Sequence, residues 1–383
     1  MTTIPCAIVR GGTTKGIFVL EDHLPVEPGQ RDRLLLELMG SPDARQIDGL
    51  GGADPLTSKV AIVSRSRRAG IDVEYESVEV GISTAQVNHG LMCGNLLAGV
   101  GFFAVAEGLI KSRSPLTTVT IYCRSNQKTI VAQVPAANAP PHASVALRFN
   151  TPGGAITGAL MPAGEPVSVL TLGNNATIAV SIVDAGTLYA FVRADALGLS
   201  GHEDAATLDG NADLRATIEV LRTKVADCVN RHGGDPATAI PPRRVKVAII
   251  APPNLKLGDA DIVARIVNPE KVHKAYAVSG AICLAAAATI PGTLVNQIFS
   301  PQGSPYQLRI GHPSGTLALV TYWSADANGI NIQAMEIQRS ARIIMRGTAY
   351  VPARTEAMQP KIVPDSADIR PAVPAVDRFD TVE

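Results

Sequence analysis

The sequence lacks an excess of charge of either sign. Lys and Arg together number 34, Asp and Glu also number 34, and no block of like charges occurs along the chain. This balance gives no electrostatic reason to expect nucleic acid or an anionic membrane surface as a partner. Any anion that the protein binds is therefore expected to be held by local geometry.

Long apolar runs and a disulfide framework are missing as well. No run approaches the roughly 20 apolar residues of a transmembrane helix. The N-terminal MTT passes directly into IPCAIV, without the charged and apolar regions of a signal peptide. The cysteines are odd in number and scattered, which fits free thiols in a reducing compartment: Cys6, Cys93, Cys123, Cys228 and Cys283. We expect a cytoplasmic protein.

Motifs for metals and nucleotides are also absent. The chain has no HExxH, no paired CxxC and no EF-hand loop, so no metal site is expected. RGGTTKG at 10–16 is not a P-loop, because its Lys precedes the last Gly instead of following it. GNLLAGVG lacks the preceding strand and spacing of a dinucleotide-binding turn. We therefore expect a protein without a cofactor.

What the chain does contain is an internal repeat. SKVAIVS at 58–64 returns as VKVAIIA at 245–251, a shift of 187 residues, and the segments that start at Val119 and Tyr306 are related by the same shift. So are the Gly-bearing apolar segments that start at Met92 and Ser279. CAIVRGGTTKGIFVLEDHLP at 6–25 resembles VSIVDAGTLYAFVRADALGL at 180–199, with a shorter shift of 174. Four elements recur in one order, which indicates two copies of one design.

The repeat predicts an α+β fold in two pseudo-symmetric halves, 1–178 and 179–340, since 383 residues usually exceed one core. Each half is expected to wrap a sheet round one buried helix, starting near Cys93 or near Ser279, because these segments are apolar on nearly all sides. A C-terminal strand within about 341–383 is expected to pair back to the first half. The active site is expected in the cleft between the halves.

Both buried helices begin with small residues, Cys93-Gly94-Asn95 in one and Ser279-Gly280-Ala281 in the other. Free backbone N–H groups and about half a positive charge at a helix start favour an anion, and Gly lets it approach closely. Two such ends facing one cleft would bind two carboxylates. The alternative is that the small residues only permit tight packing.

Two Gly-rich turns are further candidates. Thr13 and Thr14 in RGGTTKG, and His312, Ser314 and Gly315 in HPSG, offer hydroxyl and backbone donors to an anion. An ordinary hairpin turn explains HPSG equally well, and for RGGTTKG a plain hairpin is the favoured interpretation.

Candidates for acid–base chemistry are few. Cys93 at a helix start would have a lowered thiol pKa, although a free Cys is more often a small buried apolar residue. Lys59 stands where a polar loop becomes an apolar strand, where burial can remove its charge and make it a base. A surface Lys at a strand end is the alternative. Its counterpart, Lys246, carries no comparable signal.

The sequence resembles the PrpF-like isomerases, which share the diaminopimelate-epimerase-like fold. The resemblance covers nearly the whole chain and is most specific in the block at 39–64. It rests on RGGTTKG at 10–16, MGSPDARQIDGLGGADPLTSKVAIVS at 39–64, CGNLLAGVG at 93–101, HKAYAVSGAICLAAAATIPGT at 273–293 and GHPSG at 311–315.

The resemblance implies cofactor-free proton transfer or cis–trans isomerisation on a small unsaturated di- or tricarboxylate such as aconitate, methylaconitate or methylitaconate. The family's TSK motif places Ser58 in the site and the catalytic Lys at Lys59, and its helix-start Cys at Cys93. Two departures stand out. Met92 replaces an Asn, a loss that His89 could compensate unless it is only a hydrogen-bonded loop residue. PAANAPPHAS also replaces a longer segment.

Three alternatives stay open. A 4-oxalomesaconate tautomerase is the alternative substrate class. An amino-acid epimerase of this fold wants a Cys at both helix starts, whereas the second helix starts with Ser279 and has Cys283 four residues later. An inactive carboxylate-binding protein is the third. The acid, the reaction direction and whether the chain forms a homo-oligomer are left open.

Overall fold

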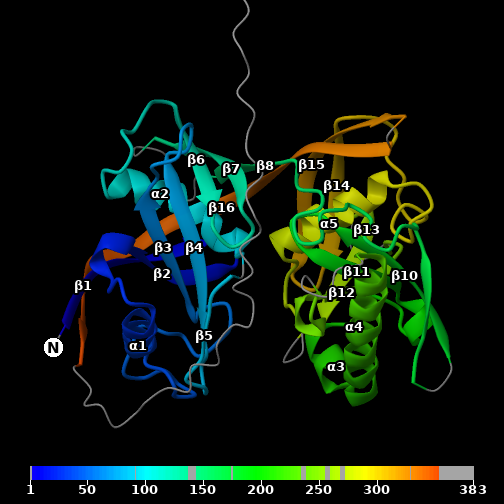
Figure 1. Cartoon of the computed structure of the whole chain (residues 1–383), viewed down its shortest axis with the longest axis horizontal. Coiled ribbons are helices and arrows are strands. Elements are labelled where there is room, and N and C mark those ends of the chain that lie inside the picture. Colours follow the sequence, from blue (N-terminus) through cyan, green and yellow to red (C-terminus); the bar gives the residue numbers. More distant parts are fainter. Residues whose placement is uncertain are drawn as a thin grey trace, which may run out of the picture.

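The computed structural model describes residues 2–90, 92–136, 144–173, 176–233, 239–254, 259–267, 272–327 and 329–352. Within these residues the chain forms two lobes side by side, joined by one long strand (Figure 1). The predicted α+β class is confirmed. No helix in this part of the chain is long and apolar enough to cross a membrane.

The first lobe is a closed barrel. Its strands pair in the order β1-β2-β3-β4-β6-β7-β8-β16, and β16 returns to β1. The strands are β1 (Thr2–Gly11), β2 (Thr14–Leu20), β3 (Lys59–Arg65), β4 (Val73–Val80), β6 (Leu116–Cys123), β7 (Lys128–Pro135), β8 (Ser144–Asn150) and β16 (Gly329–Val351). The short β5 (Val87–Asn88) pairs with β4. The helix α2 (Gly94–Ala106) contacts β1, β2, β3, β4, β7, β8 and β16, and most of its residues are buried.

The second lobe continues the same sheet. From β16 the pairing runs through β15 (Gly315–Asp326), β14 (Tyr306–His312), β13 (Ile262–Val267), β12 (Lys246–Ala251), β11 (Leu188–Arg193), β10 (Thr177–Asp184) and β9 (Ser168–Thr171). The buried helix α5 (Val278–Thr289) packs against β10, β11, β15 and β16. The helices α3 (Ala205–Gly210) and α4 (Ala212–Gly233) belong to a second apolar cluster behind this sheet.

The strands of the two lobes pair in the same series. From β1 to β7 and from β10 to β15, neighbours are antiparallel, parallel, antiparallel, parallel and antiparallel in turn. β16 then adds antiparallel to β8 in one lobe and to β15 in the other. Its last part, 341–351, pairs with β1. The rest of the range expected to contain the C-terminal strand, from 353 to 383, lies outside the described residues, as does 137–143 of the shortened segment.

Local chemistry fixes the ends of the surface helix α1 (Pro28–Met39). The Glu27 carboxylate accepts hydrogen bonds from the N–H groups of Gly29 and Gln30, at 2.9 and 2.6 Å, and Pro28 occupies the first turn. Gly40 ends the helix at a φ of 74°, which glycine adopts without strain. The helix therefore begins at the Pro and ends at the residue before Gly40.

One glycine brings the β1–β2 hairpin against the start of α2. A Cβ on Gly11 would lie 2.1 Å from the backbone oxygen of Asn95, so only glycine permits this contact. The contact places the RGGTTKG turn beside the first turn of α2.

Candidate active site

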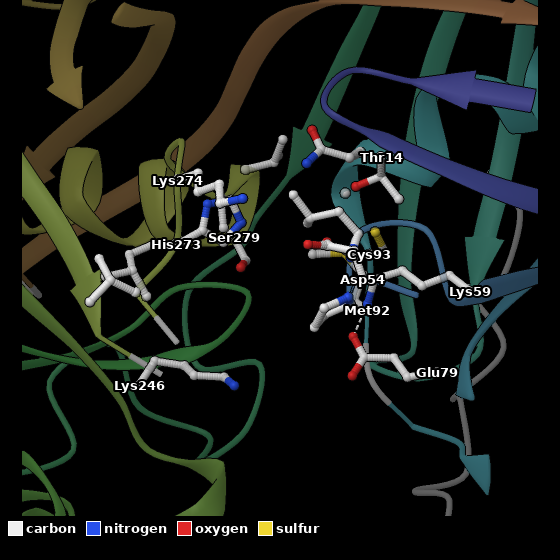
Figure 2. Close-up of a pocket in the computed structure, with 18 of the residues that line it drawn as sticks. Thr14, Asp54, Lys59, Glu79, Met92, Cys93, Lys246, His273, Lys274 and Ser279 are labelled. Carbon is white, nitrogen blue, oxygen red and sulfur yellow. Dashed lines mark hydrogen bonds and ion pairs between the residues drawn. The ribbon is translucent and has the colours of Figure 1, made fainter. Parts of the chain in front are cut away.

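A cleft of about 370 Å³ lies between the two lobes (Figure 2). Two carboxylates and three lysines contribute to its walls, so its polar chemistry is concentrated in a few side chains. Its polar and titratable lining residues are Thr14, Asp54, Lys59, Glu79, Cys93 and Asn95 from the first lobe and Tyr189, Lys246, His273, Lys274 and Ser279 from the second.

Lys59 begins β3 and forms an ion pair with Glu79, its cross-strand partner on β4. Burial lowers the pKa of Lys59, but the charge and the hydrogen bond of Glu79, with a smaller contribution from the nearby Cys93, outweigh it and hold the pKa above its ordinary value. The expectation that burial alone removes the charge of Lys59 is therefore wrong. The side chain is an ammonium in the open cleft, because the neighbouring strand supplies a carboxylate.

Cys93 is the N-cap residue of α2 and is half-buried. Its carbonyl accepts a hydrogen bond from the hydroxyl of Tyr75, at 3.1 Å, which fixes the entry to the helix. The Cys93 side chain does not cap the helix. The first N–H groups of α2 therefore remain available at the wall of the cleft.

The starts of α2 and α5 meet in the cleft. A Cβ on Gly94 would lie 2.7 Å from the Cβ of Val278, the first residue of α5. The N-cap residue of α5, Ala277, has no side-chain cap, and Ser279 in the first turn lines the cleft. Gly280 and Ala281 are buried behind it, where Gly280 packs against Tyr189.

Thr14 of the RGGTTKG turn and Asn95 of α2 each contribute a buried polar atom that has no partner within the described residues. The Thr14 hydroxyl lines the cleft and is buried without a hydrogen bond, and so is the Asn95 Oδ1. The Asn95 Nδ2 donates to the Thr13 hydroxyl at 3.0 Å, so Thr13 supports Asn95 and does not itself line the cleft. Unsatisfied buried polar groups next to a cleft are suited to a polar ligand.

Other predicted site residues are not part of the cleft lining. The Ser58 hydroxyl donates to the Val80 carbonyl and accepts from Gln46, both at 2.7 Å, so it braces the strand start. The Ser314 hydroxyl donates to the Lys274 backbone carbonyl and thereby holds a residue of the cleft. Gly315 completes this turn with a φ of 134°.

His312 lies buried near three cationic or titratable side chains and outside the cleft lining. Burial, followed by the charges of Arg339 and Arg265 and by His273, lowers the pKa of His312 to about 4. Its Nδ1 accepts the N–H of Ser314 at 3.2 Å. The geometry thus makes His312 a neutral support of the HPSG turn.

His89 is a hydrogen-bonded loop residue and does not take the place of the Asn that Met92 replaces. It bonds Glu76 at 2.6 Å and Asp32 at 2.8 Å, away from the cleft lining. These two hydrogen bonds raise the pKa of His89 to about 9. Met92 does line the cleft, where the resemblance leads one to expect an Asn.

Several lining residues were not identified from the sequence. Glu79 could have been found from the register of β3 and β4, since it lies directly opposite Lys59. Lys246 was located from the sequence as the counterpart of Lys59, 187 residues further on, but it was not assigned to the site. Asp54, Tyr189, His273 and Lys274 come from loops and a strand whose meeting depends on the approach of the two lobes.

The family described as PrpF protein matches residues 1–352. The chain belongs to the PrpF family.

Two relatives and one solved structure show how far the likeness to this PrpF-family chain extends. It is 36% identical to "3-methylitaconate isomerase" of Eubacterium barkeri, over 91% of this chain and 97% of the relative. It is 37% identical to "(4E)-oxalomesaconate Delta-isomerase" of Novosphingobium sp. (strain KA1), over 92% and 98%. The crystal structure of a methylitaconate-delta-isomerase superposes with a TM-score of 0.74 at 35% identity, covering 93% of this chain and 99% of that one.

Proposed function

We propose that this protein is an isomerase that moves a proton along a small unsaturated di- or tricarboxylate without a cofactor. The observation that carries the proposal is the Lys59–Glu79 pair in a cleft where the starts of α2 and α5 meet. The relatives support the substrate class, since their names specify isomerases of methylitaconate and oxalomesaconate.

The charge of the cleft suits such a substrate. Lys59, Lys246 and Lys274 are opposed by Asp54 and Glu79, which leaves one excess positive charge. The two helix starts add roughly half a charge each. The cleft is therefore positive by about two charges in total, enough to bind two carboxylates although the whole chain is neutral.

The proton transfer follows from the Lys59–Glu79 contact. Lys59 gives its proton to Glu79 and then takes a proton from the allylic carbon of the substrate, which leaves a dienolate with its negative charge on a carboxylate. The N–H groups at the helix starts stabilise this charge without reorganising. Lys59 returns the proton to the other end of the allylic system, the double bond shifts, and Glu79 gives back its proton. Cys93 lies at the helix start beside the reacting atoms.

We also propose that the two lobes are pseudo-symmetric halves, each with a sheet wrapped round one buried helix. The shared series of strand pairings supports this. The boundary, predicted at 178, is better placed near 152, because β9 pairs with β10 and because Asp184 accepts the N–H groups of Ile156 and Thr157 at 2.8 and 2.7 Å. The five free cysteines support a cytoplasmic location.

The test is proton NMR in D₂O with cis-aconitate, trans-aconitate, 3-methylitaconate and 4-oxalomesaconate supplied separately. We expect isomerisation or deuterium uptake at an allylic carbon of one acid. In Lys59→Ala the rate should fall about 10²- to 10⁴-fold, the range for loss of an acid–base group. Lys111→Ala, an exposed lysine of the same lobe, serves as the control.

Silence with all four acids from a folded protein would contradict the proposal. Retained binding of these acids in that case would instead indicate an inactive carboxylate-binding protein. An active Lys59→Ala variant would remove Lys59 from its assigned role.

A further inference from the structure

Lys246 stands in the second lobe where Lys59 stands in the first. Each is the first residue of a strand, β12 or β3, that runs parallel to its neighbour, β11 or β2. Figure 2 shows the Lys246 side chain reaching into the cleft from the wall opposite Glu79. The two lysines therefore face one cavity from its two sides.

Within the described residues Lys246 has no ion-pair partner. The carboxylate that acts on the charge of Lys246 is Glu79, which is already paired with Lys59. Burial lowers the pKa of Lys246; Glu79 partly offsets this, and the positive charges of Arg222 and Lys59 lower it further. Arg222 is fully buried behind it, with its guanidinium on the Val267 carbonyl at 2.6 Å. Arg222 and Lys59 each have a carboxylate of their own, Glu219 and Glu79, whereas Lys246 has none within the described residues, so an anion in the cleft would supply its missing partner.

We propose that Lys246 binds the substrate carboxylate farthest from the reacting allylic carbon, so that the acid spans the cleft from lobe to lobe. The proposal rests on the proposed function and adds a residue and a substrate requirement to it: the acid must carry a second carboxylate that reaches the second lobe. Lys246 is thus a specificity-determining residue.

The cleft wall around Lys246 favours a carboxylate over an acid–base role. Lys59 and Glu79 already form a pair that can exchange a proton, whereas in the part of the chain that the structure describes Lys246 forms no ion pair with a carboxylate. A second carboxylate of the substrate would bring the negative charge that Lys246 needs as a partner.

The test uses two inert ligands that differ by one charge, glutarate and its monoamide glutaramate, in calorimetric titrations of the full chain. Neither has a double bond to isomerise, so binding is measured apart from catalysis. The wild type should prefer glutarate. Lys246→Met should lose about 10- to 100-fold of that preference, the range for a hydrogen bond to a charged group. Lys246→Arg should restore part of it. Lys224→Met, an exposed lysine of the same lobe, is the matched control.

The outcomes separate the two proposals. Equal preference in the wild type and in Lys246→Met, or no preference in the wild type, would overturn the role of Lys246, whatever the NMR assay shows. If Lys246→Met loses the preference but no acid is isomerised, the result would support carboxylate binding by Lys246 and refute the proposed function. With a substrate that is isomerised, Lys246→Met should raise KM more than it lowers kcat. A large loss of kcat with unchanged binding would overturn the role of Lys246 in carboxylate binding and indicate a second proton-transfer group.

Discussion

At the scale of single residues, the charge of Lys59 depends on Glu79, the residue opposite it on the neighbouring strand. Burial acts against the ammonium, yet Glu79 and Cys93 outweigh it. Lys246 is half-buried at the equivalent strand start, it has no ion pair within the described residues, and burial lowers its pKa. The two lysines differ because their neighbours differ.

Glu79→Gln tests the exchange between these neighbours. The variant should lower the isomerisation rate at pH 7 by about 10²-fold, since Lys59 would have to release its proton to solvent. Because Glu79 raises the pKa of Lys59, its loss lowers that pKa, so the rate should recover as the pH rises. The measurement is the pH profile of kcat/KM. Glu107→Gln, which removes a surface partner of Arg346, is the control. A profile unchanged in height and shape would refute the exchange.

At the scale of elements, the site depends on a hairpin seated on a helix start. Gly11→Ala would put a methyl group 2.1 Å from the Asn95 oxygen, and backbone cannot move aside as a side chain can. We expect about 3 kcal/mol or more of destabilisation in urea unfolding, at the upper end of overpacking costs.

Gly347→Ala provides the matched control for Gly11→Ala. Gly347 lies in the same β1–β16 pairing, opposite Cys6, and its nearest neighbour, the Met345 Cε, is 4.0 Å from a Cβ placed there. It should change stability by less than about 0.5 kcal/mol. Similar losses in both variants would mean that the strand, and not the helix contact, sets the cost.

The elements also show what could be predicted from the sequence. The repeat and the motifs predicted the α+β class, and the resemblance to the PrpF family is confirmed. Cys93, Gly94, Asn95, Lys59 and Thr14 line the cleft, because strand starts and helix starts can be located from local pattern. Glu79 and Tyr189 could not be placed so easily, since their position depends on register and on the approach of two lobes. The prediction that burial removes the charge of Lys59 was wrong for the same reason, because it did not include the carboxylate of Glu79.

At the scale of the whole molecule, an ion pair links distant segments of the first lobe. The Arg124 guanidinium donates two hydrogen bonds of 2.7 Å to Glu21, and this contact, more than any other, lowers the pKa of Glu21 to about 2. The stabilisation is complete above the ordinary pKa of 4.5 and is lost as the pH falls toward about 2. Glu21→Gln should therefore flatten the acid limb of stability in that window, measured by urea unfolding. Exposed Glu165→Gln should leave it unchanged. An equally steep acid limb in Glu21→Gln would refute this assignment.

The long strand β16 gives the molecule a property that neither lobe has alone. Its first part pairs with β15, its middle with β8, and its last part closes the barrel on β1. Removing either lobe therefore leaves a row of unpaired backbone groups on the strand that the other lobe needs. We therefore expect that one lobe cannot be exchanged for that of a relative as an independent domain. A chimera that takes its second lobe from a relative must also take a strand that fits the barrel of the first, so specificity on the two sides of the cleft is expected to evolve together.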